Sequence, residues 1–161
     1  MFILGLNPLE VFAAGTVPGF TVGQRGISQS GKEYIFVQAD SGGVTAGFPA
    51  VITNSSFVVD MVDTTNSAPG QNAGSRIVVP QATIAASGWG WGQVSGVGNC
   101  RVAASAVKGT ILNTTGTAGQ LDDDATVGAE VIEGLTLLAT NGGSAALVSA
   151  LFTHPTIGRT L

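Results

Sequence analysis

Short stretches in which apolar and polar residues alternate recur along this chain, and glycine-rich turns separate them. The clearest is Lys32–Ala39, with the sequence KEYIFVQA. Successive residues of a strand point to opposite faces, and both faces of this segment are largely apolar. We therefore expect Lys32–Ala39 to be a strand that is covered on both sides.

The same pattern predicts eight to ten short strands, which is typical of an all-β protein with a single antiparallel β-sandwich or barrel-like domain. Asn141-Gly142-Gly143 indicates a hairpin, although each flanking segment alone could form a short helix. We expect a bulge at Gly134, and we expect His154-Pro155 to end the last strand before a tail, Thr156–Leu161. The other expected strands are Phe20–Gln24, Ala50–Thr53, Phe57–Val62, Arg76–Val79, Thr110–Asn113, Glu130–Ala139 and Ser144–Thr153.

Both tryptophans and the single cysteine lie in one segment, Gly88–Val102, with the sequence GWGWGQVSGVGNCRV. On a strand from Trp89 to Val94, the tryptophans would share one face and the glycines would line the other. A glycine-lined face allows close approach by bulky side chains. We interpret this segment as a core strand, followed by a turn at Ser95–Asn99 and a return strand, Cys100–Ala106.

The first residues form an apolar segment ahead of the first expected strand. Asn7, Pro8 and Glu10 interrupt it, and the first basic residue is Arg25, so it lacks the basic start of a signal peptide. We expect residues 1–19 to form an extended or partly helical arm, and residues 20–161 to form one β-rich domain. The side chains expected to make a protein interface on the arm are Phe2, Ile3, Leu4, Leu6, Leu9, Val11 and Phe12.

Composition changes this picture in one respect. Of the 161 residues, 44% are apolar and only 10% are charged, whereas a globular domain usually has about 25% charged residues. A subunit that packs against neighbours needs less surface charge than a soluble monomer.

The net charge is −4 and the six basic residues are scattered, so nucleic-acid binding is not expected. No apolar stretch is long enough to span a bilayer, and we find no long internal repeat.

Candidate chemistry is sparse. His154 is the only histidine, and no G-x-S-x-G motif accompanies it, so we expect it at a strand end or on the surface. Asp122–Asp124 lacks the alternating ligand spacing of a calcium loop and is expected to be a solvated turn. Glu130 and Glu133 are expected at solvated positions, and Cys100 is expected to be buried. We therefore expect no enzyme activity, cofactor or metal site.

Trp89 and Trp91 leave a second interpretation open. An exposed pair of indoles could stack on a sugar or anchor a protein partner. The chain would then be a glycan-binding or receptor-binding module on a virion or cell surface. Burial of the indoles in the core is the simpler alternative, and exposure distinguishes the two.

Several motifs resemble those of small virion proteins of tailed bacteriophages, the capsid decoration or cement proteins. They are Lys32–Ala39, Gly90–Val97, Gly119–Thr126 and the Gly134-Leu135 strand with its Gly-Gly turn. The resemblance covers Gly31–Pro155, so the first 30 residues lie outside it.

The resemblance implies a non-enzymatic β-rich protein on the outer surface of an icosahedral head. Its expected partners are the major capsid protein and further copies of itself, with a trimer favoured over a dimer. Such a protein would stabilise the contacts between capsid subunits. No nucleic-acid or membrane partner is expected.

Overall fold

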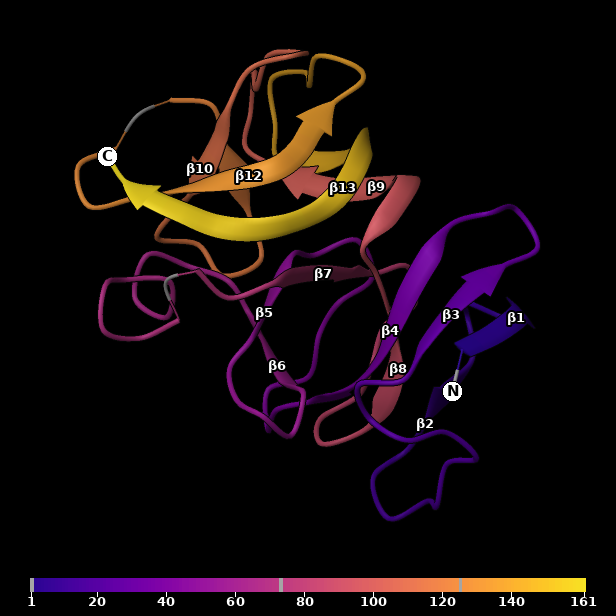
Figure 1. Ribbon diagram of the computed structural model, residues 1–161. Coiled ribbons are helices and arrows are strands. Elements are labelled where there is room, and N and C mark those ends of the chain that lie inside the picture. Colours follow the sequence, from indigo (N-terminus) through magenta and orange to yellow (C-terminus); the bar gives the residue numbers. More distant parts are fainter. Residues whose placement is uncertain (1, 73, 125) are drawn as a thin grey trace.

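The computed structural model describes residues 2–72, 74–124 and 126–161, and it confirms that the fold is all-β (Figure 1). Within these residues the chain forms strands β1 to β13 and no helix. Most of the strands are arranged in two closed rings of five, and the N-terminal strands lie beside the first ring.

The first ring closes because β4 pairs with both β6 and β8. The order of strands around it is β4-β6-β5-β7-β8, and only the β4–β6 pair is parallel. Its members are β4 (Glu33–Ala39), β5 (Ala50–Ile52), β6 (Val58–Met61), β7 (Ile77–Pro80) and β8 (Trp89–Gln93).

The second ring is a closed barrel with the order β9-β11-β10-β12-β13, and only its β9–β11 pair is parallel. Its members are β9 (Ser95–Val102), β10 (Leu112–Thr114), β11 (Leu121–Asp122), β12 (Glu130–Leu137) and β13 (Ala146–Thr160). Taken in chain order, the five strands of this ring repeat the connections and directions of the first five. The expectation that the chain has no long internal repeat is therefore wrong at the level of structure.

Backbone details repeat as well: the equivalent turn residues from Gly43 to Gly47 and from Ser105 to Gly109 are 62 residues apart, and the equivalent threonines Thr83 and Thr140 are 57 residues apart. Residues with a positive φ occur at Gly43 (73°) and Ser105 (65°), and at Gly47 (77°) and Gly109 (76°). The backbone N–H of Ala46 donates to Thr83 Oγ1 at 3.1 Å, and that of Lys108 donates to Thr140 Oγ1, also at 3.1 Å. These matches show that the turns repeat together with the strands.

The repeat is not visible in the amino-acid sequence, because few equivalent positions carry the same residue. Over the best-matched stretch, residues 43–61 and 105–123, the identical pairs are Gly47 with Gly109, Thr53 with Thr115, and Asp60 with Asp122. Many of the other positions keep only their burial or their backbone conformation, which many residue types satisfy.

The two rings are packed against each other through a shared core. One cluster fills the interior of the second ring and also contains Val51, Val62, Ile77 and Val79 from the first ring. Val78 belongs to the separate cluster inside the first ring, so successive residues of β7 point into different cores. Figure 1 shows β9 to β13 lying over β5, β6 and β7.

Strand β8 confirms the expected glycine-lined face. A Cβ on Gly90 would lie 2.9 Å from Ile84 Cδ1, and one on Gly92 would lie 2.6 Å from Val78 Cβ. Both neighbours belong to the core of the first ring, so the glycines make room for them. The expected turn at Ser95–Asn99 is wrong, because β9 begins at Ser95 and the chain passes directly into the second ring.

The end of the chain also differs from expectation. Strand β13 continues through His154-Pro155 to Thr160, so there is no separate tail from Thr156 onward. The pairing of β12 with β13 shifts between Glu133 and Leu135, where an irregularity was expected, but the extra residues are Thr153–Pro155 on β13, opposite Gly134. Proline is tolerated at a bulge because no ladder hydrogen bond needs its missing N–H.

One early strand is displaced. Phe20–Gln24 is not a strand, and the first partner of β4 is instead β3 (Arg25–Ser28). The backbone N–H of Gly23 and the carbonyl of Gln24 still bond to Phe36, at 2.7 and 2.8 Å. The segment therefore bonds to β4 at two points, but the regular strand pairing starts at Arg25.

Candidate functional site

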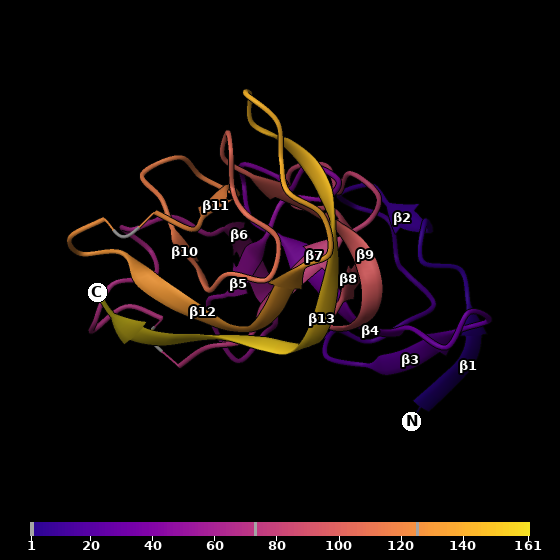
Figure 2. The ribbon, with the colours of Figure 1, turned by 90° about the horizontal axis from the view of Figure 1, so that it is seen from above.

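The N-terminal arm is attached to the first ring by two short strands. Strand β1 (Phe2–Leu6) pairs in parallel with β3, and β2 (Val11–Phe12) pairs antiparallel with β8. Figure 2 shows β1, β2 and β3 along one side of the molecule, with the C-terminus on the opposite side. The arm is thus extended, and its backbone belongs to the sheet.

One side of the arm covers the outer face of β4 and β8. Ile3, Leu6 and Phe12 pack with Phe20 and Val22 against a cluster that contains Tyr34, Phe36 and Trp91. The ring centroids of Phe20 and Trp91 are 5.1 Å apart, and those of Phe36 and Trp91 are 5.0 Å apart. Both pairs meet edge to face, the geometry that aromatic rings favour.

Four large apolar side chains of the arm are exposed to solvent: Phe2, Leu4, Leu9 and Val11, of which Leu4 is 79% and Leu9 is 60% exposed. We call these four side chains the arm row. The seven residues expected at an interface therefore fall into two groups. Four form the arm row, whereas Ile3, Leu6 and Phe12 pack against other residues of the same chain.

Local backbone geometry produces this division. Strand alternation alone would place Leu4 and Leu6 on the same side, but the pairing register shifts between them and Gly5 has a φ of +75°. Leu6 therefore turns inward onto Gly26, where an added Cβ would lie 2.5 Å from Leu6 Cδ2. Sequence periodicity cannot show this shift.

A side-chain turn separates the two strands of the arm. Asn7 Oδ1 accepts from the backbone N–H of Leu9 at 3.1 Å, and the Asn7 carbonyl accepts from Glu10 N–H at 3.2 Å. Asparagine favours such turns because its side chain bonds to the backbone two residues on. The turn presents Leu9 on the surface, next to the single acidic residue of the arm, Glu10.

The tryptophan pair is not an open platform. Trp91 is only 1% exposed because the arm and Phe20 cover it, and Trp89 is half-buried. Trp91 Nε1 has no hydrogen-bond partner among the described residues. The face that these indoles share is therefore a packing surface for the arm.

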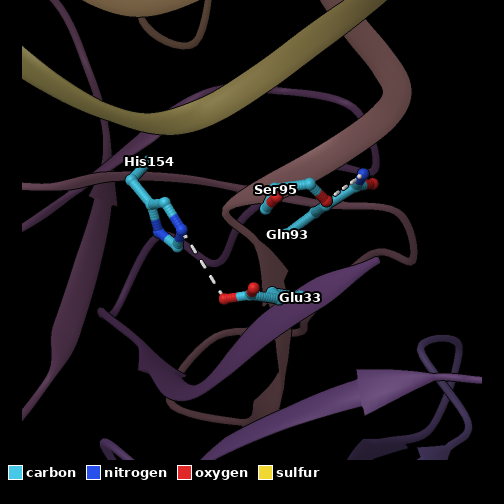
Figure 3. A network of polar contacts seen from close by, with 4 residues as sticks. All are labelled: Glu33, Gln93, Ser95 and His154. Carbon is cyan, nitrogen blue, oxygen red and sulfur yellow. Dashed lines mark hydrogen bonds and ion pairs between the residues drawn. The ribbon is translucent and has the colours of Figure 1, made fainter. Parts of the chain in front are cut away.

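His154 lies on the surface at the junction of the two rings (Figure 3). Its Nε2 is 3.5 Å from Glu33 Oε2, and the two side chains are 44% and 34% exposed. Nearby, Gln93 Nε2 donates to the Ser95 carbonyl at 3.0 Å. An exposed pair of this kind contributes about 0–1 kcal/mol, and the contact joins β4 to β13.

The three aspartates at 122–124 support a turn of the chain. Asp123 Oδ2 accepts from the backbone N–H of Val107 at 3.0 Å and from Thr110 Oγ1 at 3.4 Å. Desolvation by burial raises the pKa of Asp122; hydrogen bonds from the backbone of Asp123 and Asp124 partly offset this effect, and the charges of the same two aspartates raise the pKa further by a smaller amount. Within residues 2–72, 74–124 and 126–161, no three His, Cys, Asp or Glu side chains are grouped to hold a metal ion.

Two further side chains have clear positions. Glu130 is buried, so its expected solvated position is wrong; its Oε1 accepts from Thr160 Oγ1 at 2.7 Å where the last strand covers it. Glu133 is exposed as expected. Cys100 is buried in the second ring, as expected, and burial raises the pKa of its thiol.

Comparison with known proteins gives no family for this chain: no family model matches it, and no curated protein matches it. In the described part of the chain, no helix is long and apolar enough to cross a membrane.

Proposed function

We propose that this chain is a capsid decoration protein, which binds the outer surface of an icosahedral phage head and stabilises the contacts between major capsid subunits. The arm row is the observation that carries the proposal. Four large apolar side chains are held in water by an arm whose other side is firmly packed. Several large exposed apolar side chains on one short segment are typical of a segment that binds another protein.

Two further features support the proposal. The two rings share a core, so the molecule offers a rigid body rather than a flexible one. Its surface is poor in charge, which suits a subunit that is surrounded by neighbours. Many copies that each bury a modest interface would add up over a symmetric shell.

The alternative, a glycan-binding module, has weaker support. Its proposed platform needs both indoles at the surface, whereas Trp91 is buried beneath the arm. A sugar would have to displace the arm before it could stack on this residue.

The test of the proposal is the place of the protein in virions from the source of this sequence. Electron microscopy with an antibody against the chain is expected to label the outside of the heads. Labelling of tails only, or purified virions that lack the protein, would overturn the proposal.

Substitutions then test the arm. Heads stripped of the protein are incubated with the wild-type chain or with the double variant Leu4→Ser and Leu9→Ser, and the bound protein is measured on gels. The variant is expected to bind at least about tenfold more weakly, because two exposed anchors are lost and the effect multiplies over many copies. Val127→Ser is the matched control, because Val127 is 98% exposed and lies far from the arm in sequence.

A further inference from the structure

The structural repeat places two equivalent outer faces on the molecule. In the first ring, β4 and β8 pair so that Val37 lies opposite Gly90; in the second, β9 and β13 pair so that Cys100 lies opposite Val148. The outer face of β4 and β8 carries Trp91 and is covered by the arm. The described residues contain one such arm, so the equivalent face of the second ring is not covered in the same way.

That second face carries a group of large apolar side chains, with the polar pair Ser149 and Asn99 between them. It carries Val97, Leu138, Leu147 and Leu151, which are between 38% and 49% exposed. Val97 pairs directly with Leu151, and the backbone N–H of Leu138 bonds to the adjacent Ser149 carbonyl at 2.9 Å. We call these four residues the second-ring face. A solvated face of an antiparallel sheet is normally polar.

The arm row and the second-ring face account for most of the exposed apolar surface. Among the residues that the structure describes, 13 large apolar side chains are exposed; the arm row supplies four of them and the second-ring face another four. The arm row lies beside the first ring, whereas the second-ring face lies on the second ring. Each surface therefore needs a partner outside its own chain.

We propose that the arm row of one copy docks on the second-ring face of another copy. This contact would repeat, between two chains, the way in which the arm covers the first ring within one chain. The arm would then lie between two equivalent faces, with its inner side on its own first ring and its outer side on a neighbour's second ring.

Charge and shape favour this occupant. Arg101 is the single charged residue of β9, and its guanidinium lies 4.4 Å from the centre of the Phe48 ring. Both residues line a surface hollow of about 230 Å³ together with Leu147. A hollow with apolar walls and a cation at its rim fits a leucine followed by an acid, and the arm presents Leu9 and Glu10 in that order.

The inference uses the same arm row as the proposed function, but its test needs no capsid. The mass of the isolated full chain is measured by light scattering after size-exclusion chromatography, at tens of micromolar protein. Wild type is expected to exceed the 16.1 kDa of one chain. A monomer under these conditions would overturn the inference, and labelling on heads would still decide the proposed function.

Two variants each remove one side of the contact. The first carries Leu4→Asp and Leu9→Asp; the second carries Val97→Asp and Leu151→Asp. Both are expected to be monomers, because each places two charges in an apolar contact. Val127→Asp, at a 98% exposed position outside both surfaces, is expected to assemble as wild type does. An oligomer that survives in either double variant would contradict the contact.

Mixing the two monomeric variants gives the sharpest result. One retains the second-ring face and the other retains the arm row, so a mixture is expected to contain a complex with one chain of each. If faces paired only with faces, the arm variant would self-associate without the other variant, and if arms paired only with arms, the face variant would do so. Either result, or a mixture of two monomers that stays monomeric, would refute the arm-to-face contact. Unchanged tryptophan fluorescence of each variant is the control that its arm is still packed on Trp91.

Charge reversal tests the alignment of the surfaces without adding charge to the apolar contact. Glu10→Lys and Arg101→Glu are each expected to weaken self-association about tenfold, and the double reversal is expected to recover most of the loss. Equal weakening by the single and double reversals would show that these two residues do not face each other.

Discussion

Replacing Phe20 with alanine tests whether the arm side of the molecule is held by its aromatic cluster. The Phe20 ring centroid lies 5.3 Å from that of Phe36 and 5.1 Å from that of Trp91. Phe12 adds a third neighbour at 6.1 Å. The Phe20→Ala substitution therefore removes an aromatic side chain that packs between the arm and the first ring of strands.

The expected loss can be worked from burial and from these contacts. Truncating a fully buried phenylalanine costs about 3–5 kcal/mol. Phe20 is half-buried, so about half of that range applies, and lost edge-to-face contacts of about 0.5–1.5 kcal/mol each lie within it. We expect the free energy of unfolding to fall by about 2 kcal/mol, a change of roughly thirtyfold in the folding equilibrium.

Urea unfolding followed by tryptophan fluorescence measures this change, and acrylamide quenching of the folded protein measures the exposure of Trp91. Phe20→Ala is expected to lower the midpoint and increase quenching. Val17→Ala is the matched control, because Val17 lies on the same segment and is 92% exposed. If both variants had the same midpoint and quenching, Phe20 would not be packed on Trp91 and the reasoning would fail.

Three further predictions concern the second ring and the repeat. Cys100 is expected to react with a thiol reagent only as the protein unfolds, so labelling should be at least about a thousandfold slower in buffer than in denaturant. Burial raises the pKa of Asp122 above 3.8, so the folded state binds the proton more tightly than the unfolded state does. This residue therefore lowers the free energy of unfolding as the pH rises from 3.8 through the higher pKa of the folded state. Asp122→Asn should therefore raise the unfolding midpoint at pH 7 and reduce its pH dependence; a lower midpoint would refute this. Ser105→Gly is expected to change stability by no more than about 1 kcal/mol in thermal unfolding, because Ser105 already has a positive φ. Gly43→Ser at the equivalent position should lose more, because its Cβ would lie 2.9 Å from the Ile84 carbonyl oxygen.

Alternation along the chain was sufficient to predict the strands whose partners lie on both sides. Lys32–Ala39 matches β4 almost residue for residue, because both faces of that strand are buried and its apolar pattern is complete. The glycine face of β8 was also predictable, because three glycines at alternate positions leave space that only neighbouring side chains can fill. These are local signals, and they do not depend on knowing the partner strand.

Features that depend on distant partners could not be predicted in this way. Strand β13 accommodates Pro155 because this residue lies in an irregular stretch of the pairing, where Thr153–Pro155 face Gly134, far away in the sequence. Leu4 and Leu6 separate to opposite sides of the arm because the register on β3 shifts at Gly5. The repeat is hidden for a related reason: its constraints are on backbone conformation and burial, and Gly43 and Ser105 meet the same constraint with different residues.

The repeat explains why one chain carries two unlike apolar surfaces. Two equivalent rings have two equivalent outer faces, but one arm can cover only one of them. A contact between two second-ring faces would leave both arm rows in water, and a contact between two arm rows would leave both faces in water. An arm-to-face contact that closes with cyclic symmetry covers the arm row and the second-ring face of every chain. Since burial of apolar area stabilises association by about 25 cal/mol per Å², the arrangement that buries both surfaces is the one that the exposed side chains favour.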